Sequence, residues 1–196
     1  MVQISIVGWN EPKIFLCYTL MKKDANHNSR QLQFKNGRKA LSDAAHASGI
    51  NMEHHTFEIF ENEGGKIVDS NGTFRASASI SHSKSHSFAV VGPRDYSIGL
   101  DVEPSNRIVG REVLKYIDST LDSLQEHELS NDELITLWIQ NEAIVKATGH
   151  GLSITKNVYR QNKQWVFGKN AFSTIHWKID LEEYSFCIAL AKKLER

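Results

Sequence analysis

Strand-like and helix-like segments follow one another irregularly in this chain of 196 residues, and that mixture most limits what it can fold into. Because strands and helices do not alternate strictly, the order favours an α+β fold over a doubly wound parallel sheet. Helical spacing predicts helices at Gly37–Ser48, Val113–Leu124 and Asp132–Thr148. Short runs of β-branched, aromatic or apolar residues predict strands at Val2–Val7, Ile14–Leu20, His55–Phe60, Lys66–Val68, Phe88–Gly92, Tyr96–Glu103, Gln164–Phe167, Thr174–Ile179 and Ser185–Ala191.

The composition argues against several classes of partner. Lysine plus arginine and aspartate plus glutamate number 23 each, so no global charge favours nucleic acid or an anionic membrane. No stretch approaches the roughly 18 apolar residues of a membrane span, and the first residues lack the pattern of a signal peptide. The two cysteines, Cys17 and Cys187, lie far apart in the sequence. We therefore expect a soluble, cytoplasmic protein with reduced thiols.

The strand Tyr96–Glu103 carries acidic residues on one face. Its alternation places the apolar residues on one side and Gly99, Asp101 and Glu103 on the other. Carboxylates two residues apart on a strand, about 6.6 Å, can converge on one hard cation, which prefers oxygen ligands. Gly99 removes bulk where a ligand could approach. A half-exposed strand with an acidic outer face would give the same pattern.

A second candidate feature lies on the last predicted helix. Ser130 and Glu133 have the spacing of a capping box, which predicts that the helix begins there. Trp138, Glu142 and Lys146 follow at intervals of four and therefore share one face. A tryptophan on that face indicates a partly buried or cleft-lining surface. In a cleft, a carboxylate can act as base or metal ligand and an ammonium can bind phosphate. An exposed ion pair is the alternative interpretation.

The segment Ser79-Ile80-Ser81-His82-Ser83 is dense in small hydrogen-bonding side chains, which can bind a phosphate without crowding. Zinc is disfavoured, because no cysteine or carboxylate stands near His82 and His86 at a usual ligand spacing. Other histidines, among them His150, are predicted to be surface or packing residues.

Together these segments resemble the 4'-phosphopantetheinyl transferases of the Sfp type, which are similar to holo-acyl-carrier-protein synthases. The resemblance rests on four stretches in the family's order, namely Ser79–Ser83, Ile98–Glu103, Trp138–Lys146 and Thr148–Ser153. The separation of Asp101 and Glu142 also fits the family's spacing. The sequence departs from the family pattern at Asn141, where a lysine is usual, and at Ile67, where a proline is common.

The resemblance implies a fold of two similar α+β halves related by pseudo-twofold symmetry. The halves would be residues 1–97, which contribute part of the coenzyme A site, and 98–196, which carry the metal and catalytic residues. Coenzyme A would bind in the cleft between them. Two halves in one chain would allow the protein to work as a monomer.

The resemblance also implies an activity, the magnesium-dependent transfer of 4'-phosphopantetheine from coenzyme A to a serine of an apo carrier protein, with release of 3',5'-ADP. The carrier would be an acyl, peptidyl or aryl carrier protein of fatty acid, polyketide or nonribosomal peptide biosynthesis. Manganese would also fit the metal site. The implied metal ligands are Asp101, Glu103 and Glu142. The implied catalytic residues are Glu142 and Lys146, and the coenzyme A contacts are Arg38, Lys66, Ser81, His82 and Lys146. Arg107, Arg111 and Lys115 are candidates for docking the acidic carrier.

Two other functions remain open at this point. A family member that binds coenzyme A but has lost catalysis is favoured only by Asn141. A different metal-dependent enzyme, such as a phosphohydrolase, could use the same carboxylates.

Overall fold

The computed structural model describes residues 2–4, 14–20, 29–83, 85–114, 129–151, 157–161, 164–181 and 184–194. The first part of the chain contains β1 (Val2–Ile4), β2 (Ile14–Leu20), α1 (Ser29–Ala47), a 3-10 turn (Met52–His54), β3 (His55–Phe60), β4 (Gly64–Asp69), β5 (Phe74–His82) and β6 (His86–Gly92). The second part contains β7 (Ile98–Pro104), a 3-10 turn (Arg111–Val113), α3 (Asn131–Ala147), β8 (Val158–Gln161), β9 (Gln164–Phe167), β10 (Asn170–Leu181) and β11 (Tyr184–Lys193).

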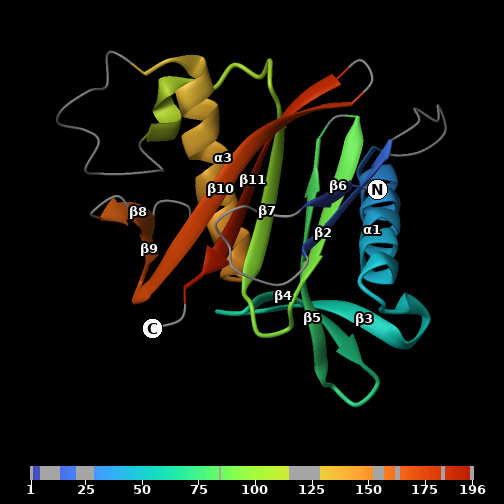
Figure 1. Cartoon of the computed structure of the whole chain (residues 1–196). Coiled ribbons are helices and arrows are strands. Elements are labelled where there is room, and N and C mark those ends of the chain that lie inside the picture. The colour runs from blue at the N-terminus through green and yellow to red at the C-terminus, as the bar shows by residue number, and fades with distance from the viewer. Residues whose placement is uncertain are drawn as a thin grey trace.

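The described strands form two antiparallel sheets, each packed with one helix. The six-stranded sheet has the order β1-β2-β6-β5-β4-β3, and the five-stranded sheet has the order β7-β11-β10-β9-β8. Helix α1 packs on the first sheet and α3 on the second (Figure 1). The predicted α+β class is confirmed. In the first part, β2 and α1 are followed by the four strands β3 to β6, and β6 pairs with β2. In the second part, β7 and α3 are followed by the four strands β8 to β11, and β11 pairs with β7.

The predicted elements agree with the structure best where their signals are local. The bounds of β3 and β9 are confirmed, and α1 ends before Gly49, whose φ of 87° suits a glycine. Helix α1 begins at Ser29, earlier than the predicted start at Gly37. The prediction missed its first turns because they are polar and show no apolar periodicity. Strands β5 and β8 were not predicted, and the predicted helix Val113–Leu124 lies outside the described residues after Leu114.

The core between the two sheets holds the molecule together. Phe88 of β6, Leu100 of β7 and Phe186 of β11 are fully buried in one cluster that draws residues from both sheets. Separate clusters lie between each helix and the outer face of its own sheet. The layers therefore run from α1 through the two sheets to α3 (Figure 1). Neither described helix is both long and apolar enough to cross a membrane.

Serine hydroxyls of β5 join the two sheets. β7 is an edge strand, so the backbone N–H groups on its open side need partners other than a neighbouring strand. The N–H of Leu100 donates to Ser79 Oγ at 3.0 Å, and that of Val102 donates to Ser81 Oγ at 3.2 Å. The serine-rich segment thus fixes β7 against β5.

Ser79→Ala is expected to lower the free energy of unfolding by about 1–3 kcal/mol, because it leaves the buried Leu100 N–H without an acceptor. Urea denaturation measures the change. Ser70→Ala, at an exposed serine, is the control and should have no effect. Equal stability of the two variants would contradict a joining role for Ser79.

Candidate active site

Strand β7 directs its acidic face toward α3. A Cβ atom at Gly99 would lie 1.9 Å from the backbone oxygen of Ala143, so the helix lies directly against the strand. The expectation that Gly99 leaves room for a ligand is wrong, because the backbone of α3 fills that space. Asp101, two residues further along β7, shares the face of Gly99 and is therefore brought to α3.

Helix α3 is fixed at its start. The predicted capping box is present, with Ser130 Oγ accepting from the Glu133 N–H and the Glu133 carboxylate accepting from the Ser130 N–H. Asn131 also accepts from the Val109 N–H at 2.9 Å and donates to the Arg107 carbonyl at 2.8 Å. These bonds tie the helix to the segment that follows β7, so the face with Glu142 and Lys146 keeps its orientation.

Ser81, Asp101 and Lys146 form a hydrogen-bonded cluster from three separate elements. Lys146 Nζ donates to Asp101 Oδ1 at 2.7 Å and to Ser81 Oγ at 3.0 Å. Ser81 Oγ also donates to Asp101 Oδ1 at 3.0 Å. The side chain of Asp101 is 5% exposed and that of Lys146 is 25% exposed. The cluster is therefore mostly desolvated but keeps one side open to solvent at the lysine.

Glu142 lies beside this cluster with an altered acidity. Burial, and next the negative charge of Asp101, raise the pKa of Glu142 from 4.5 to about 7, while Lys146 and Arg107 partly oppose the shift. Asp101 Oδ2 is buried and has no hydrogen-bond partner among the described residues. Two neighbouring carboxylates, one of which has a buried oxygen that no described group binds, are a suitable place for a cation.

Glu103 is held apart from these two carboxylates. It forms an ion pair with Arg107, whose guanidinium carbon lies 6.0 Å from the centre of the Trp138 ring. Within the described ranges, no group of three or more histidine, cysteine or acidic side chains is placed to hold a metal ion. Of the three expected metal ligands, the structure brings Asp101 and Glu142 together and leaves Glu103 with Arg107.

His82 packs against helix α1, and Arg38 is part of that helix. His82 Nδ1 is hydrogen-bonded with Ser87 Oγ at 3.0 Å, and the ring packs against Gly37, where a Cβ would lie 2.5 Å from its Cε1 atom. Burial of the imidazole, and next the positive charge of Lys146, lower the pKa of His82. The exposed Arg38 places its guanidinium 5.1 Å from the Phe34 ring centre and 5.7 Å from that of Phe57.

Two pockets flank the cluster, and β5 runs from one to the other with Ser81 between them. The first, which we name the lysine pocket, has a volume of 290 Å³ and is lined by Phe57, Ile59, Gly65, Ala78, Ser79, Ile80, Lys146, Gly149, His150 and Gly151. The second, the tyrosine pocket, has a volume of 770 Å³ and is lined by Gln33, His82, Ser83, Ser85, Glu103, Pro104, Asn106, Arg107, Tyr184 and Phe186.

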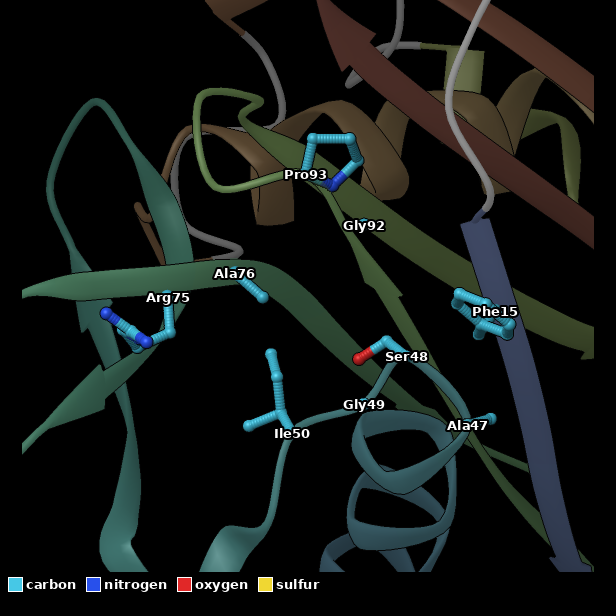
Figure 2. Close-up of a pocket in the computed structure, with 9 residues that line it drawn as sticks. All are labelled: Phe15, Ala47, Ser48, Gly49, Ile50, Arg75, Ala76, Gly92 and Pro93. Carbon is cyan, nitrogen blue, oxygen red and sulfur yellow. The ribbon is translucent and has the colours of Figure 1, made fainter.

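A third pocket lies away from the cluster. Figure 2 shows its nine lining residues, which come from the end of α1 and the turn after it, from β2, from β5 and from the end of β6. Its volume is 870 Å³, and among the described residues that line it Arg75 is the one with a charged side chain. None of the sequence-predicted site residues lines it.

The sequence did not identify several pocket residues. His150, expected to be a surface or packing residue, lines the lysine pocket and pairs with Glu61 at 3.2 Å. Phe57 lines the lysine pocket, and Tyr184 lines the tyrosine pocket. Both lie on strands with no motif near them, so only the fold brings them to the site. Among the expected docking residues, Lys115 and the side chain of Arg111 lie outside the described part of the chain.

Lys66 is not brought to the cluster. Its side chain is buried, and Nζ donates to Ser77 Oγ at 3.0 Å and to the carbonyls of Arg94 at 2.9 Å and Tyr96 at 2.7 Å. Burial lowers the pKa of this ammonium. Lys66 therefore anchors the connection between β6 and β7, with all three of its donors in use.

Lys66→Met is expected to lower the free energy of unfolding by about 2 kcal/mol, because the carbonyls of Arg94 and Tyr96 lose a buried donor. Chemical denaturation measures this, with Lys39→Met on the exposed face of α1 as the neutral control. If the protein binds coenzyme A, as the resemblance implies, the affinity measured by calorimetry should stay within about twofold of wild type. Weaker cofactor binding at unchanged stability would instead support the cofactor-binding role that the resemblance implies.

The site has to be interpreted from its own chemistry. No protein-family model matches the chain, and no curated protein is significantly similar to it. Lys146 can bind an anionic ligand, and the neighbouring carboxylates of Asp101 and Glu142 can bind a cation. A carboxyl group with a pKa near 7 can also accept a proton at neutral pH. Asn141 is fully buried, and the family that the sequence resembles usually has lysine at this position, where an ammonium would lose its hydration.

Proposed function

We propose that the protein transfers the 4'-phosphopantetheine arm of coenzyme A to a serine of an apo carrier protein and is a 4'-phosphopantetheinyl transferase of the Sfp type. The observation that carries the proposal is the cluster of Ser81, Asp101 and Lys146 with Glu142 beside it. These residues come from three motifs that are far apart in the sequence. The repeated topology supports a fold of two halves related by pseudo-twofold symmetry, with the site where β5 of one half meets β7 and α3 of the other.

The residues present fit a magnesium or manganese ion. Their donors are all oxygens, Asp101 Oδ2 is buried without a partner in the described part of the chain, and Glu142 faces a second negative charge. Asp101 and Glu142 would hold the ion, and Glu103 would join them on release from Arg107. When bound, the metal supplies positive charge for the diphosphate of coenzyme A.

The protein side chains divide the remaining work. Glu142, which lies beside Asp101 at the cluster, accepts the proton of the carrier serine hydroxyl. The serine oxygen forms a bond to the β-phosphorus of coenzyme A, and the bond to the oxygen that bridges to the α-phosphate breaks, releasing 3',5'-ADP. Lys146 stabilises the charge that develops on the phosphates, and Ser81 and His82 position them.

The lysine pocket suits the nucleotide end of coenzyme A. The Phe57 ring offers a surface for a base, and the Arg38 guanidinium beside that ring offers charge for the 3'-phosphate. Lys146 lines the same pocket and reaches the diphosphate. In this proposal the protein is cytoplasmic and works as a monomer. A monomer is sufficient because both halves of one chain contribute side chains to the site. Arg107 helps to dock an acyl, peptidyl or aryl carrier protein.

The test is incubation with coenzyme A, magnesium and a panel of apo carrier proteins, followed by intact-mass measurement. The expected result is a carrier whose mass increases by that of the phosphopantetheine group, and no increase when magnesium is removed. Binding of coenzyme A without loading of any carrier would indicate a catalytically impaired protein. Release of inorganic phosphate without a carrier would indicate a phosphohydrolase. Either result would overturn the proposal.

A further inference from the structure

Helices α1 and α3 end in the same way. The last helical residue is followed by a hydroxyl residue, Ser48 after α1 and Thr148 after α3. A glycine with positive φ comes next, 87° at Gly49 and 71° at Gly149. Both hydroxyls donate to the carbonyl three residues earlier at 2.7 Å, and both N–H groups donate to the carbonyls three and four residues earlier. The two helix ends are therefore equivalent, in keeping with the repeated topology of the sheets.

The end of α3 is covered by the turn between β3 and β4. The Asn62 N–H donates to the Thr148 carbonyl at 2.6 Å, and Glu61 Oε1 lies 3.2 Å from His150 Nε2. A Cβ atom at Gly149 would lie 2.0 Å from a backbone oxygen at the end of β3, so the turn fits only against a glycine. A polypeptide turn is thus the kind of group that fits this type of helix end.

The end of α1 is uncovered and borders the third pocket. Four of the nine lining residues, 47–50, are the counterparts of residues 147–150 (Figure 2). A Cβ atom at Gly49 would have no described atom within 4 Å beyond its chain neighbours, and the Ser48 carbonyl accepts no hydrogen bond from the described residues. Strands β8 and β9, the counterparts of β3 and β4, have four residues each rather than six. None of their described residues lines the pocket.

The third pocket offers the groups that hold the turn at α3. Gly49 leaves room for a backbone carbonyl, and the Ser48 carbonyl is an acceptor for a backbone N–H. The side chain of Arg75 is 53% exposed, and its ion pair with Asp69 is long at 3.9 Å. Arg75 therefore supplies positive charge for an acidic side chain, in place of the imidazole at α3.

We propose that the third pocket binds a turn of a partner protein, in which an acidic residue directly precedes a residue whose N–H donates to the Ser48 carbonyl. The acidic side chain pairs with Arg75, and the backbone of the turn lies against Gly49. The pocket is separate from the cluster at Lys146, so this inference does not depend on the proposed function.

The test uses a head-to-tail cyclic peptide that contains residues 58–66, the sequence around the turn that covers α3. NMR spectra of the isotope-labelled full chain measure its binding. We expect shifts at Ser48, Gly49 and Ala76, with a dissociation constant on the order of 0.1–1 mM, since the interface is small. The matched control is the same peptide methylated at the backbone nitrogen of Asn62, which should bind at least about fivefold more weakly because it lacks the donor. Arg75→Ala should weaken binding about threefold, as for an exposed ion pair.

Gly49→Asn tests whether the peptide occupies the third pocket. Asparagine adopts positive φ more readily than most residues, and the space around Gly49 is open, so the melting temperature should fall by no more than about 4 °C. The added side chain occupies the place of the turn backbone, and peptide binding should be lost. Gly149→Asn, the matched variant at α3, should lower the melting temperature at least twice as much, because it displaces the β3–β4 turn.

Several results would overturn the proposal. These are unchanged peptide binding by Gly49→Asn, shifts confined to α3, or no binding by wild type at the highest soluble peptide concentration. Acetate that shifts the same resonances as strongly as the peptide would show that the pocket takes a small carboxylate and not a turn. Equal melting temperatures of the Gly49→Asn and Gly149→Asn variants would show that the two helix ends do not differ in what covers them.

Discussion

Asp101→Asn is expected to reduce the proposed phosphopantetheine transfer at least about 100-fold and also to destabilise the fold. The substitution keeps the volume of the side chain but removes the anion that binds Lys146 at 2.7 Å. Loss of one partner of a fully buried ion pair costs about 3–5 kcal/mol. Because Lys146 is 25% exposed, solvent compensates part of the loss, and we expect a decrease of about 2 kcal/mol in the free energy of unfolding.

Intact-mass measurement of carrier loading and urea denaturation test the two effects of Asp101→Asn separately. Asp180→Asn on β10 is the matched control, because Asp180 is an exposed strand carboxylate outside both pockets. It should leave both properties unchanged. Loading by Asp101→Asn at a rate within tenfold of wild type would show that Asp101 is not part of the active site.

The elements that carry the site could be predicted because their signals are local. The capping box at Ser130 and Glu133 gave the start of α3 to within one residue, and the alternation in β7 gave the correct faces. Both patterns depend on residues only a few positions apart. Local chemistry of this kind is visible in a single sequence.

The contacts between these elements were not predictable in the same way. Alternation indicates that Gly99 and Asp101 share a face, but not that α3 covers that face. Ser81 was expected to contact phosphate, whereas its first role in the structure is to accept the N–H of Val102 and to bond to Asp101 and Lys146. The partner of each side chain depends on how β5, β7 and α3 pack, which spacing alone does not determine.

Motif order also could not distinguish positioning from binding among the charged residues. Lys66 follows Gly65 in a stretch that suggests cofactor contact, yet its ammonium is enclosed by two carbonyls and a hydroxyl. Glu103 belongs to the acidic strand, but Arg107, four residues later, neutralises it. Each outcome depends on which partner lies nearest in space.

Glu142→Gln is expected to reduce the proposed transfer by about 100-fold or more, and yet to stabilise the metal-free protein. The pKa of Glu142 rises from 4.5 to about 7 on folding, so between these pH values the folded state binds more protons than the unfolded chain. Stability of the wild type therefore falls as pH rises through this window and stays low above it. Glutamine has no charge to bury, and at pH 8 the variant should gain roughly 2 kcal/mol, or about 4–8 °C in melting temperature.

Melting curves of metal-free wild type and Glu142→Gln at pH 5 and pH 8 test this expectation. The advantage of the variant should be large at pH 8 and small at pH 5, and magnesium should raise the melting temperature of wild type more than that of the variant. Glu58→Gln, at an exposed carboxylate of β3, is the control and should melt like wild type at both pH values. A Glu142→Gln protein that is less stable than wild type at pH 8 would show that burial and the charge of Asp101 do not destabilise the Glu142 carboxylate in the folded state. The site would then have no excess negative charge for a cation to neutralise.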